Sequence, residues 1–132
     1  GKGIVLNPGN DITIVATGHL VWEALLAAET LETEGISAEV INIHTIKPLD
    51  VDLLTNSVKK TKCVVTAEEH NYLGGLGESV AGALARKAPA PQEFVATQDT
   101  FGESGTPAQL MEKYGLNKNA IINAVKKVIK RK

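Results

Sequence analysis

The chain has 132 residues, of which 43% are hydrophobic and only 4% aromatic, and its net charge at neutral pH is −1. This length fits one domain in the usual range of ~50–250 residues. The core must be built from aliphatic side chains. A near-neutral chain has no general attraction to nucleic acid or to an acidic membrane surface. The single cysteine, Cys63, excludes an internal disulfide, and we expect a buried thiol within a strand.

No apolar run approaches the ~20 residues that a membrane span needs, and the first residues lack the charged and apolar blocks of a signal peptide. We therefore expect a cytoplasmic protein. The chain does not begin with Met, which is consistent either with processing or with excision from a longer polypeptide.

The first part of the chain alternates strand and helix patterns. Residues 12–17 are short and β-branched, which predicts a buried strand. Residues 20–31 repeat apolar side chains at helical spacing, and Gly35 provides the stop. Residues 38–43 predict a second strand. The apolar stripe expected on the helix is Val21, Ala24, Leu25, Ala28 and Leu31.

The middle of the chain repeats the pattern. Pro48 ends regular pairing, and Asp50 can cap a helix that includes residues 53–58. Residues 62–66 predict the third strand, and residues 75–86 the helix that follows it.

The last part predicts one more strand and two helices. Residues 93–97 form the fourth strand, and residues 106–109 have the pattern of a capping box that opens a short helix ending at Gly115. Asn117 caps the final helix. Its expected core stripe is Ile121, Ala124, Val125, Val128 and Ile129. Its basic end suits the helix dipole better than a nucleic-acid patch, since no aromatic residues are interleaved.

Strands that alternate with helices indicate parallel pairing through right-handed crossovers. The fold class predicted is therefore α/β, a three-layer α/β/α sandwich around a mostly parallel sheet of four or five strands. We expect one domain over residues 11–132. Residues 1–10 contain Ile4, Val5 and Leu6, and form either an edge strand or a linker.

Three histidines share one placement, because His19, His44 and His70 each follow a predicted strand. In a parallel sheet they lie along its carboxyl edge, with Glu68, Glu69 and Asp99 on or near the same rim. Imidazoles and carboxylates are usual metal ligands, but the spacing is loose. Contacts with another domain and ordinary loop positions are the alternatives, and we predict no metal site.

The glycines near His70 allow two interpretations. Gly74, Gly75 and Gly77 open the third helix, so free backbone N–H groups could cradle a phosphate. Alternatively, they form a tight turn that packs closely on a neighbour. Gly18 after the first strand has the same two interpretations.

Four other side chains are candidates for contacts. Glu68 and Glu69 are neighbours in or beside a strand, so they should point to opposite sides, which argues against a catalytic pair. Tyr72 is a candidate contact with a partner domain, since aromatic residues are enriched in interface cores. Trp22 is either a core residue or an anchor for a partner.

Three stretches together resemble the C-terminal domain of transketolase. They are Asn42–Asp50, Glu68–Glu78 and Ser104–Leu116. The first also resembles pyruvate dehydrogenase β subunits and deoxyxylulose-phosphate synthase, whereas the second and third favour transketolase. The resemblance covers nearly the whole domain, from about Gly9 onward.

The resemblance implies a part of an enzyme that transfers a two-carbon ketol unit between sugar phosphates. In such enzymes an N-terminal domain with a Gly-Asp-Gly segment and a later Asn holds thiamine diphosphate and a divalent metal, Mg or Ca, and a middle domain supplies the glutamate that activates the cofactor. This chain has no Gly-Asp-Gly segment and no room for either domain. The implied partners are the remaining transketolase domains or subunit, in a homodimer of the complete enzyme. No nucleic acid or membrane is expected.

We therefore predict no catalytic and no cofactor-binding residue in this chain, which alone should be inactive. The matched positions are assigned to fold and interface, and they are Lys47, Pro48, Asp50, Glu68, Glu69, His70, Gly74, Gly75, Gly77 and Glu78. A regulatory ligand site on the carboxyl rim, or the equivalent domain of a pyruvate dehydrogenase β subunit or deoxyxylulose-phosphate synthase, remain as alternatives.

Overall fold

The computed structural model describes residues 2–44, 46–71, 75–97 and 117–132. Five strands form one sheet in the order β1-β3-β2-β4-β5. Every neighbouring pair is parallel except β1 and β3, which are antiparallel. The strands are β1 (Ile4–Asn7), β2 (Ile12–Ala16), β3 (Ala38–Asn42), β4 (Val64–Asn71) and β5 (Gln92–Thr97).

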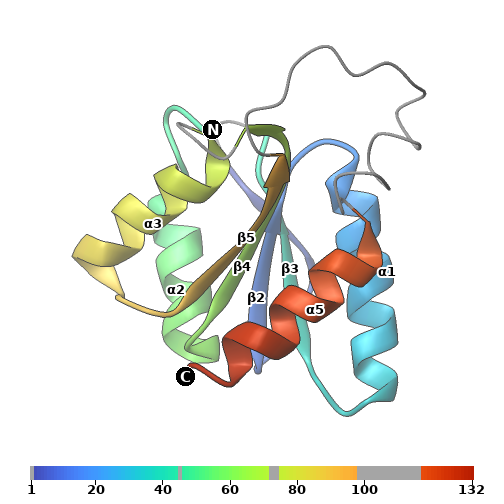
Figure 1. Cartoon of the computed structure of the whole chain (residues 1–132). Helices are drawn as coiled ribbons and strands as arrows, with labels where there is room; N and C mark the ends of the chain where they lie inside the picture. The colour runs from blue at the N-terminus through green and yellow to red at the C-terminus, as the bar shows by residue number, and fades with distance from the viewer. Residues whose placement is uncertain (1, 45, 72–74, 98–116) are drawn as a thin grey trace.

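Helices cover both faces of this sheet (Figure 1). Helices α1 (Leu20–Thr33) and α5 (Lys118–Ile129) pack on one face. Helices α2 (Val51–Thr61) and α3 (Leu76–Lys87) pack on the other. The structure thus confirms the predicted three-layer α/β/α sandwich. Among the described residues, no helix is long and apolar enough to cross a membrane.

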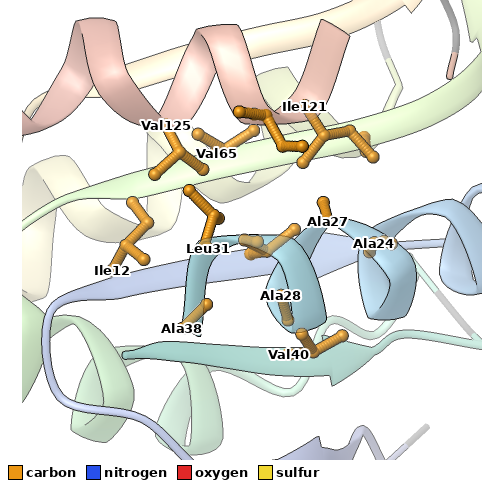
Figure 2. Packing of buried hydrophobic residues seen from close by; sticks show 14 of the residues in the cluster. Ile12, Ala24, Ala27, Ala28, Leu31, Ala38, Val40, Val65, Ile121 and Val125 are labelled. Carbon is orange, nitrogen blue, oxygen red and sulfur yellow. The ribbon is translucent and has the colours of Figure 1, made fainter. Parts of the chain in front are cut away.

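The core is aliphatic, as the low aromatic content requires. Figure 2 shows the larger cluster, in which Leu31 of α1 and Ile121 and Val125 of α5 meet the sheet residues Ile12 and Val65. A second cluster fills the other face and includes residues of α2 and α3. Each large aliphatic side chain that is fully buried contributes roughly 1.5–3 kcal/mol, so these two clusters dominate the stability of the fold.

Helix α1 buries a stripe that differs in part from the predicted one. Ala24, Ala28 and Leu31 are buried as predicted, and so are Leu20 and Ala27, whereas Val21 and Leu25 are only partly buried. Trp22 is 64% exposed, so the interpretation of this residue as a core side chain is wrong. Trp22 lies on the exposed face of α1, as Glu29 does, and this face points away from the sheet.

The predicted helix boundaries are set by the residues that the sequence indicated. Gly35 has a positive φ of 82° directly beyond α1, a conformation that glycine adopts without steric cost. Asp50 Oδ1 accepts a hydrogen bond from the Leu53 N–H at 3.3 Å, and Asn117 Oδ1 accepts one from the Ala120 N–H at 3.0 Å. The capping box at residues 106–109 and the helix stop at Gly115 lie outside the described residues.

Strand β4 differs from its prediction at both ends. Lys62 is the left-handed C-cap of α2, with a φ of 71°, and the strand begins only at Val64. It then runs through Glu68, Glu69 and His70 to Asn71, where the sequence predicted a loop. The strand extends this far because β5 pairs with its end, with Asn71 opposite Thr97.

The basic end of the chain pairs with carboxylates of its own fold. Lys126 Nζ lies 2.7 Å from Glu34 Oε1, and both Lys127 and Arg131 contact Glu93. Exposed ion pairs of this kind contribute only about 0–1 kcal/mol each. These contacts place three of the five basic residues at this end in ion pairs within the domain.

Cys63 is fully buried, as predicted, although it lies one residue before β4 instead of within a strand. Burial raises the pKa of the Cys63 thiol, and the negative charge of Asp11 adds to this, while Lys132 opposes it. A thiol with a raised pKa is a poor nucleophile, so Cys63 serves the core and not chemistry.

Glu39 on β3 provides a pH-dependent contribution to stability. Its side chain is buried beside α2, where Oε1 accepts hydrogen bonds from Lys60 Nζ at 2.6 Å and from the Gly9 N–H at 3.2 Å. Burial alone would raise the pKa of Glu39, but the hydrogen bonds from Lys60, Ser57 and Gly9, with the charge of Lys60, bring it below the ordinary value.

A carboxyl group with a lowered folded-state pKa stabilises the fold only while it is ionised. The contribution of Glu39 should therefore be complete above the ordinary glutamate pKa and should disappear as the pH falls through the lower folded-state value. In Glu39→Gln, urea unfolding measured over acid pH should show a shallower loss of stability than in the wild type. Glu32→Gln, an exposed change, is the control. Equal acid dependence in Glu39→Gln and the wild type would contradict this assignment.

Candidate functional site

The parallel strands bring their carboxyl ends to one edge of the sheet, at the top of Figure 1. We call this the carboxyl edge, formed by residues 17–19 after β2, residues 43–44 and 46–50 after β3, the end of β4 from Glu68, and residues 75–77. Strand β2 leads to α1 on one face, and the neighbouring β4 leads to α3 on the other. This point of divergence is where open α/β sheets form their ligand crevices.

Glu68 occupies the α3 side of this point. Its side chain is 1% exposed, with Oε1 2.8 Å from the Leu76 nitrogen and Oε2 2.7 Å from the Gly77 nitrogen. Both oxygens therefore accept hydrogen bonds from the first turn of α3. The sequence placed Glu68 on or near the carboxyl rim, with a role in the fold or in an interface, and in this domain the residue is buried at that rim. Glu68 is an internal cap, buried because the helix begins directly over the strand.

Glu69 points to the opposite face, as the alternation along a strand predicts. Its Oε1 accepts a hydrogen bond of 2.6 Å from the backbone N–H of His19, the residue before α1. Gly18 has a positive φ of 59°, and a Cβ added there would lie 2.7 Å from Glu69 Oε1. Glycine is thus favoured at position 18 for two reasons, namely the left-handed backbone conformation and the close approach of the Glu69 carboxylate.

Gly77, at the start of α3, packs closely on its neighbours. Close packing is one of the two roles that the sequence predicts for these glycines, the other being a phosphate cradle. A Cβ on Gly77 would lie 2.5 Å from Cε2 of Phe94 and 3.1 Å from Thr66 Oγ1. The N–H groups of Leu76 and Gly77 are already held by Glu68, so these two donors do not form a phosphate cradle. Gly75 is the extended N-cap of α3. Tyr72 and Gly74 lie outside the described residues.

His19 and His44 follow β2 and β3 as predicted, whereas His70 lies within β4 because that strand is longer than predicted. His19 and His44 are exposed, and His44 Nε2 lies 3.4 Å from Asn42 Nδ2. The backbone of His70 belongs to β4, whereas its side chain and all of Asp99 lie outside the described part. Within that part, no group of three or more His, Cys, Asp or Glu side chains is placed to hold a metal ion.

Three hollows of the described surface lie away from this edge. One of about 420 Å³ includes Pro8, Ala28, Glu32 and Ser37 in its lining, around the amino end of β3. Two smaller ones flank β5, beside Phe94. None of these three hollows is lined by the exposed His19 or His44.

Two further carboxylates meet helix starts, and one of them has no local sequence signal. Asp50 caps α2, and its Oδ2 also accepts a hydrogen bond from the Gly3 N–H at 2.9 Å. Glu23 on α1 accepts one from the Lys118 N–H at 2.9 Å, at the first residue of α5. Because Glu23 and Lys118 are 95 residues apart, only the fold brings them together.

The strand order and the two helical layers define a doubly wound α/β domain, the class in which the carboxyl edge is the functional edge. Residues 1–121 match the family model described as the C-terminal domain of transketolase. The chain belongs to this family, as the three resembling stretches predicted.

The relatives agree with that assignment. The chain is 47% identical over 132 residues to the 6-deoxy-6-sulfo-D-fructose transketolase subunit SqwH of Clostridium sp. (strain MSTE9), covering all of this chain and 41% of that protein. A structure described as a split gene transketolase, inactive beta4 tetramer, superposes with a TM-score of 0.94 at 47% identity, over 98% of this chain and 42% of the other.

A pyruvate dehydrogenase E1 component subunit beta from Staphylococcus epidermidis is 44% identical over 105 residues, covering 76% of this chain and 32% of that subunit. The chain therefore spans less than half the length of these relatives.

Proposed function

We propose that this chain is the C-terminal structural and assembly domain of a transketolase, with the bond-making groups on other domains or on a separate subunit. The observation that carries the proposal is the family match over residues 1–121 in a chain that spans only 41% of the SqwH subunit. The complete enzyme would transfer a two-carbon ketol unit between sugar phosphates in the cytoplasm, as in the pentose phosphate pathway.

The complete enzyme would use thiamine diphosphate and a divalent metal, Mg or Ca. The described residues of this chain do not fit that cofactor. A diphosphate needs free backbone N–H groups or cations, yet Glu68 and Glu69 fill the helix starts where the sheet diverges. We assign no catalytic step and no cofactor contact to this domain.

The role proposed for the carboxyl edge is docking to the rest of the enzyme. Gly18, His19 and His44 are exposed there, and Trp22 one turn into α1 is 64% exposed. Exposed tryptophan is a frequent anchor of interfaces, because it buries a large area at a small cost in side-chain entropy. The partners would be the remaining transketolase domains or subunit, within a homodimer of the complete enzyme.

The second candidate is the equivalent domain of a pyruvate dehydrogenase β subunit, and the relative from Staphylococcus epidermidis supports it. Both candidates share the docking role and differ in the reaction of the complete enzyme. The neighbouring reading frame separates them, since a transketolase half should accompany the first and an α subunit of pyruvate dehydrogenase the second.

The experiment is an assay of ketol transfer with this chain, thiamine diphosphate and magnesium, alone and with the polypeptide encoded beside or before it. We expect no turnover from the chain alone and turnover from the combination. Turnover at ordinary enzyme rates by the chain alone would refute the proposal. Activity of the partner that does not change when this chain is omitted would refute the assembly role.

A further inference from the structure

We propose that the carboxyl edge of this domain is closed to phosphate-bearing ligands by the chain's own carboxylates. In doubly wound folds the helix starts at this edge are ready-made anion sites, because their first N–H groups are unpaired and the helix dipole is positive there. The inference deepens the proposed function, on which it rests, since it specifies which class of occupant the docking edge excludes.

Each described helix has a carboxylate at its start. Glu69 holds the N–H before α1, Asp50 holds one in α2, and Glu68 holds two in α3. Glu23 holds the first N–H of α5. Four of these five donors belong to helix turns that an anion would approach, and the fifth, on His19, lies in the turn that leads into α1. The carboxylates come from β4, from the N-cap of α2 and from α1, so the pattern does not depend on a single element.

The balance of charge strengthens the exclusion. A helix start carries about half a positive elementary charge, whereas each capping carboxylate brings a full negative one. Asp52 and Glu78 place further acidic residues in the first turns of α2 and α3, and Glu23 itself lies in the first turn of α1. An incoming phosphate would therefore meet net negative charge, and it would reach these five N–H donors only by displacing a carboxylate.

Burial makes that displacement costly at α3. Glu68 is 1% exposed. In the part of the chain that the structure describes, it forms no ion pair, and its charge is stabilised by the two N–H groups and the dipole at the start of α3. Its carboxylate can leave only if both hydrogen bonds to the first turn of α3 break. Glu69 is half-buried, so it is the easier of the two to replace without loss of the fold.

Removal of a carboxylate should convert its helix start into a phosphate site. The probe is inorganic phosphate, titrated into the full 132-residue chain at constant ionic strength maintained with sodium chloride, and read from backbone amide NMR signals. In the wild type we expect no saturable shift of the His19, Leu76 or Gly77 signals at millimolar phosphate.

In Glu69→Ala the His19 signal should shift saturably, with an apparent affinity at least about tenfold above the wild type. In Glu68→Ala the Leu76 and Gly77 signals should do so. Glu29→Ala, which removes an exposed charge from the outer face of α1, is the matched control and should behave as the wild type. If Glu68→Ala does not fold, Glu69→Ala decides the question.

Two results would overturn the inference. One is saturable phosphate binding by the wild type at these amides. The other is a folded Glu69→Ala variant that gains no phosphate affinity over Glu29→Ala. Neither result bears on ketol transfer by the assembled enzyme, so a failure here is separate from a failure of the proposed function.

Discussion

Replacing Gly9 with alanine is expected to destabilise the domain by about 3 kcal/mol, because the new methyl group has no space and its neighbours are backbone atoms. A Cβ at this position would lie 2.6 Å from the Ala38 carbonyl oxygen and closer still to the adjacent Ala38 and Glu39 backbone atoms. Backbone atoms of β3 cannot turn aside as a side chain can.

Relief of this clash would move the turn before β2. That turn is fixed by the Gly9 N–H to Glu39 and by the Asp11 N–H to the Ser37 carbonyl oxygen, at 2.8 Å. Both hydrogen bonds would weaken together. The measurement is the free energy of unfolding in urea, with a thermal midpoint that should fall by roughly 10 °C.

Gly82→Ala is the matched control. Gly82 lies inside α3, is exposed, and a Cβ there would meet nothing within 4 Å. Because alanine favours the helix over glycine, this change should stabilise the domain by about 0.5–1 kcal/mol. If Gly9→Ala were neutral, or if both changes had the same sign, the close approach of the turn to β3 would be wrong.

Replacing Glu68 with glutamine should cost about 2–3 kcal/mol although the two side chains have nearly the same shape. One oxygen becomes an NH2 group that faces the N–H of Leu76 or Gly77, so one buried donor loses its acceptor. The remaining hydrogen bond also loses its charge and its interaction with the dipole of α3.

Chemical unfolding of Glu68→Gln should therefore show a lower midpoint with an unchanged slope. Amide hydrogen exchange at Leu76 and Gly77 should accelerate more than at buried positions elsewhere in the sheet. Glu29→Gln on the outer face of α1 should change neither quantity. A stability within error of the wild type would show that the buried carboxylate does not hold the start of α3.

The sequence predicted most of the fold because the information is local. The β-branched run at residues 12–17, the helical spacing at residues 20–31 and the caps Asp50 and Asn117 each act within a few residues, and the structure contains all of them. The predicted end of β4 is wrong because the information that sets it is not local. The strand ends where its pairing with β5 ends, and β5 is distant in sequence.

The candidate site was less predictable. Ordinary cap signals span about three residues, whereas Glu68 reaches a helix start eight residues later, across the glycine turn. The contact of Glu69 with His19 spans 50 residues, and no periodicity indicates it. Strand alternation did predict that the two glutamates diverge. It could not predict that both glutamates would contact the start of a helix, because this depends on α1 and α3 packing on opposite faces of the sheet.

Trp22 illustrates a further limit of pattern reading. The apolar spacing of residues 20–31 fixes the direction of the buried stripe only approximately, and a bulky apolar residue beside that stripe is compatible with either side. The packing of α1 on the sheet and beside α5 decides the matter and leaves Trp22 64% exposed. Its exposure in this domain is what makes it a candidate anchor for the rest of the enzyme.

The docking role of the carboxyl edge is tested most directly by amide hydrogen exchange of this chain, free and assembled with the remaining transketolase polypeptide. We predict that assembly protects residues 17–19 and 75–77 and the helix turn around Trp22, while Pro8–Asp11 and Ser37 at the opposite edge exchange at unchanged rates wherever an amide is present. Protection confined to that opposite edge, with residues 17–19 unaffected, would contradict the account.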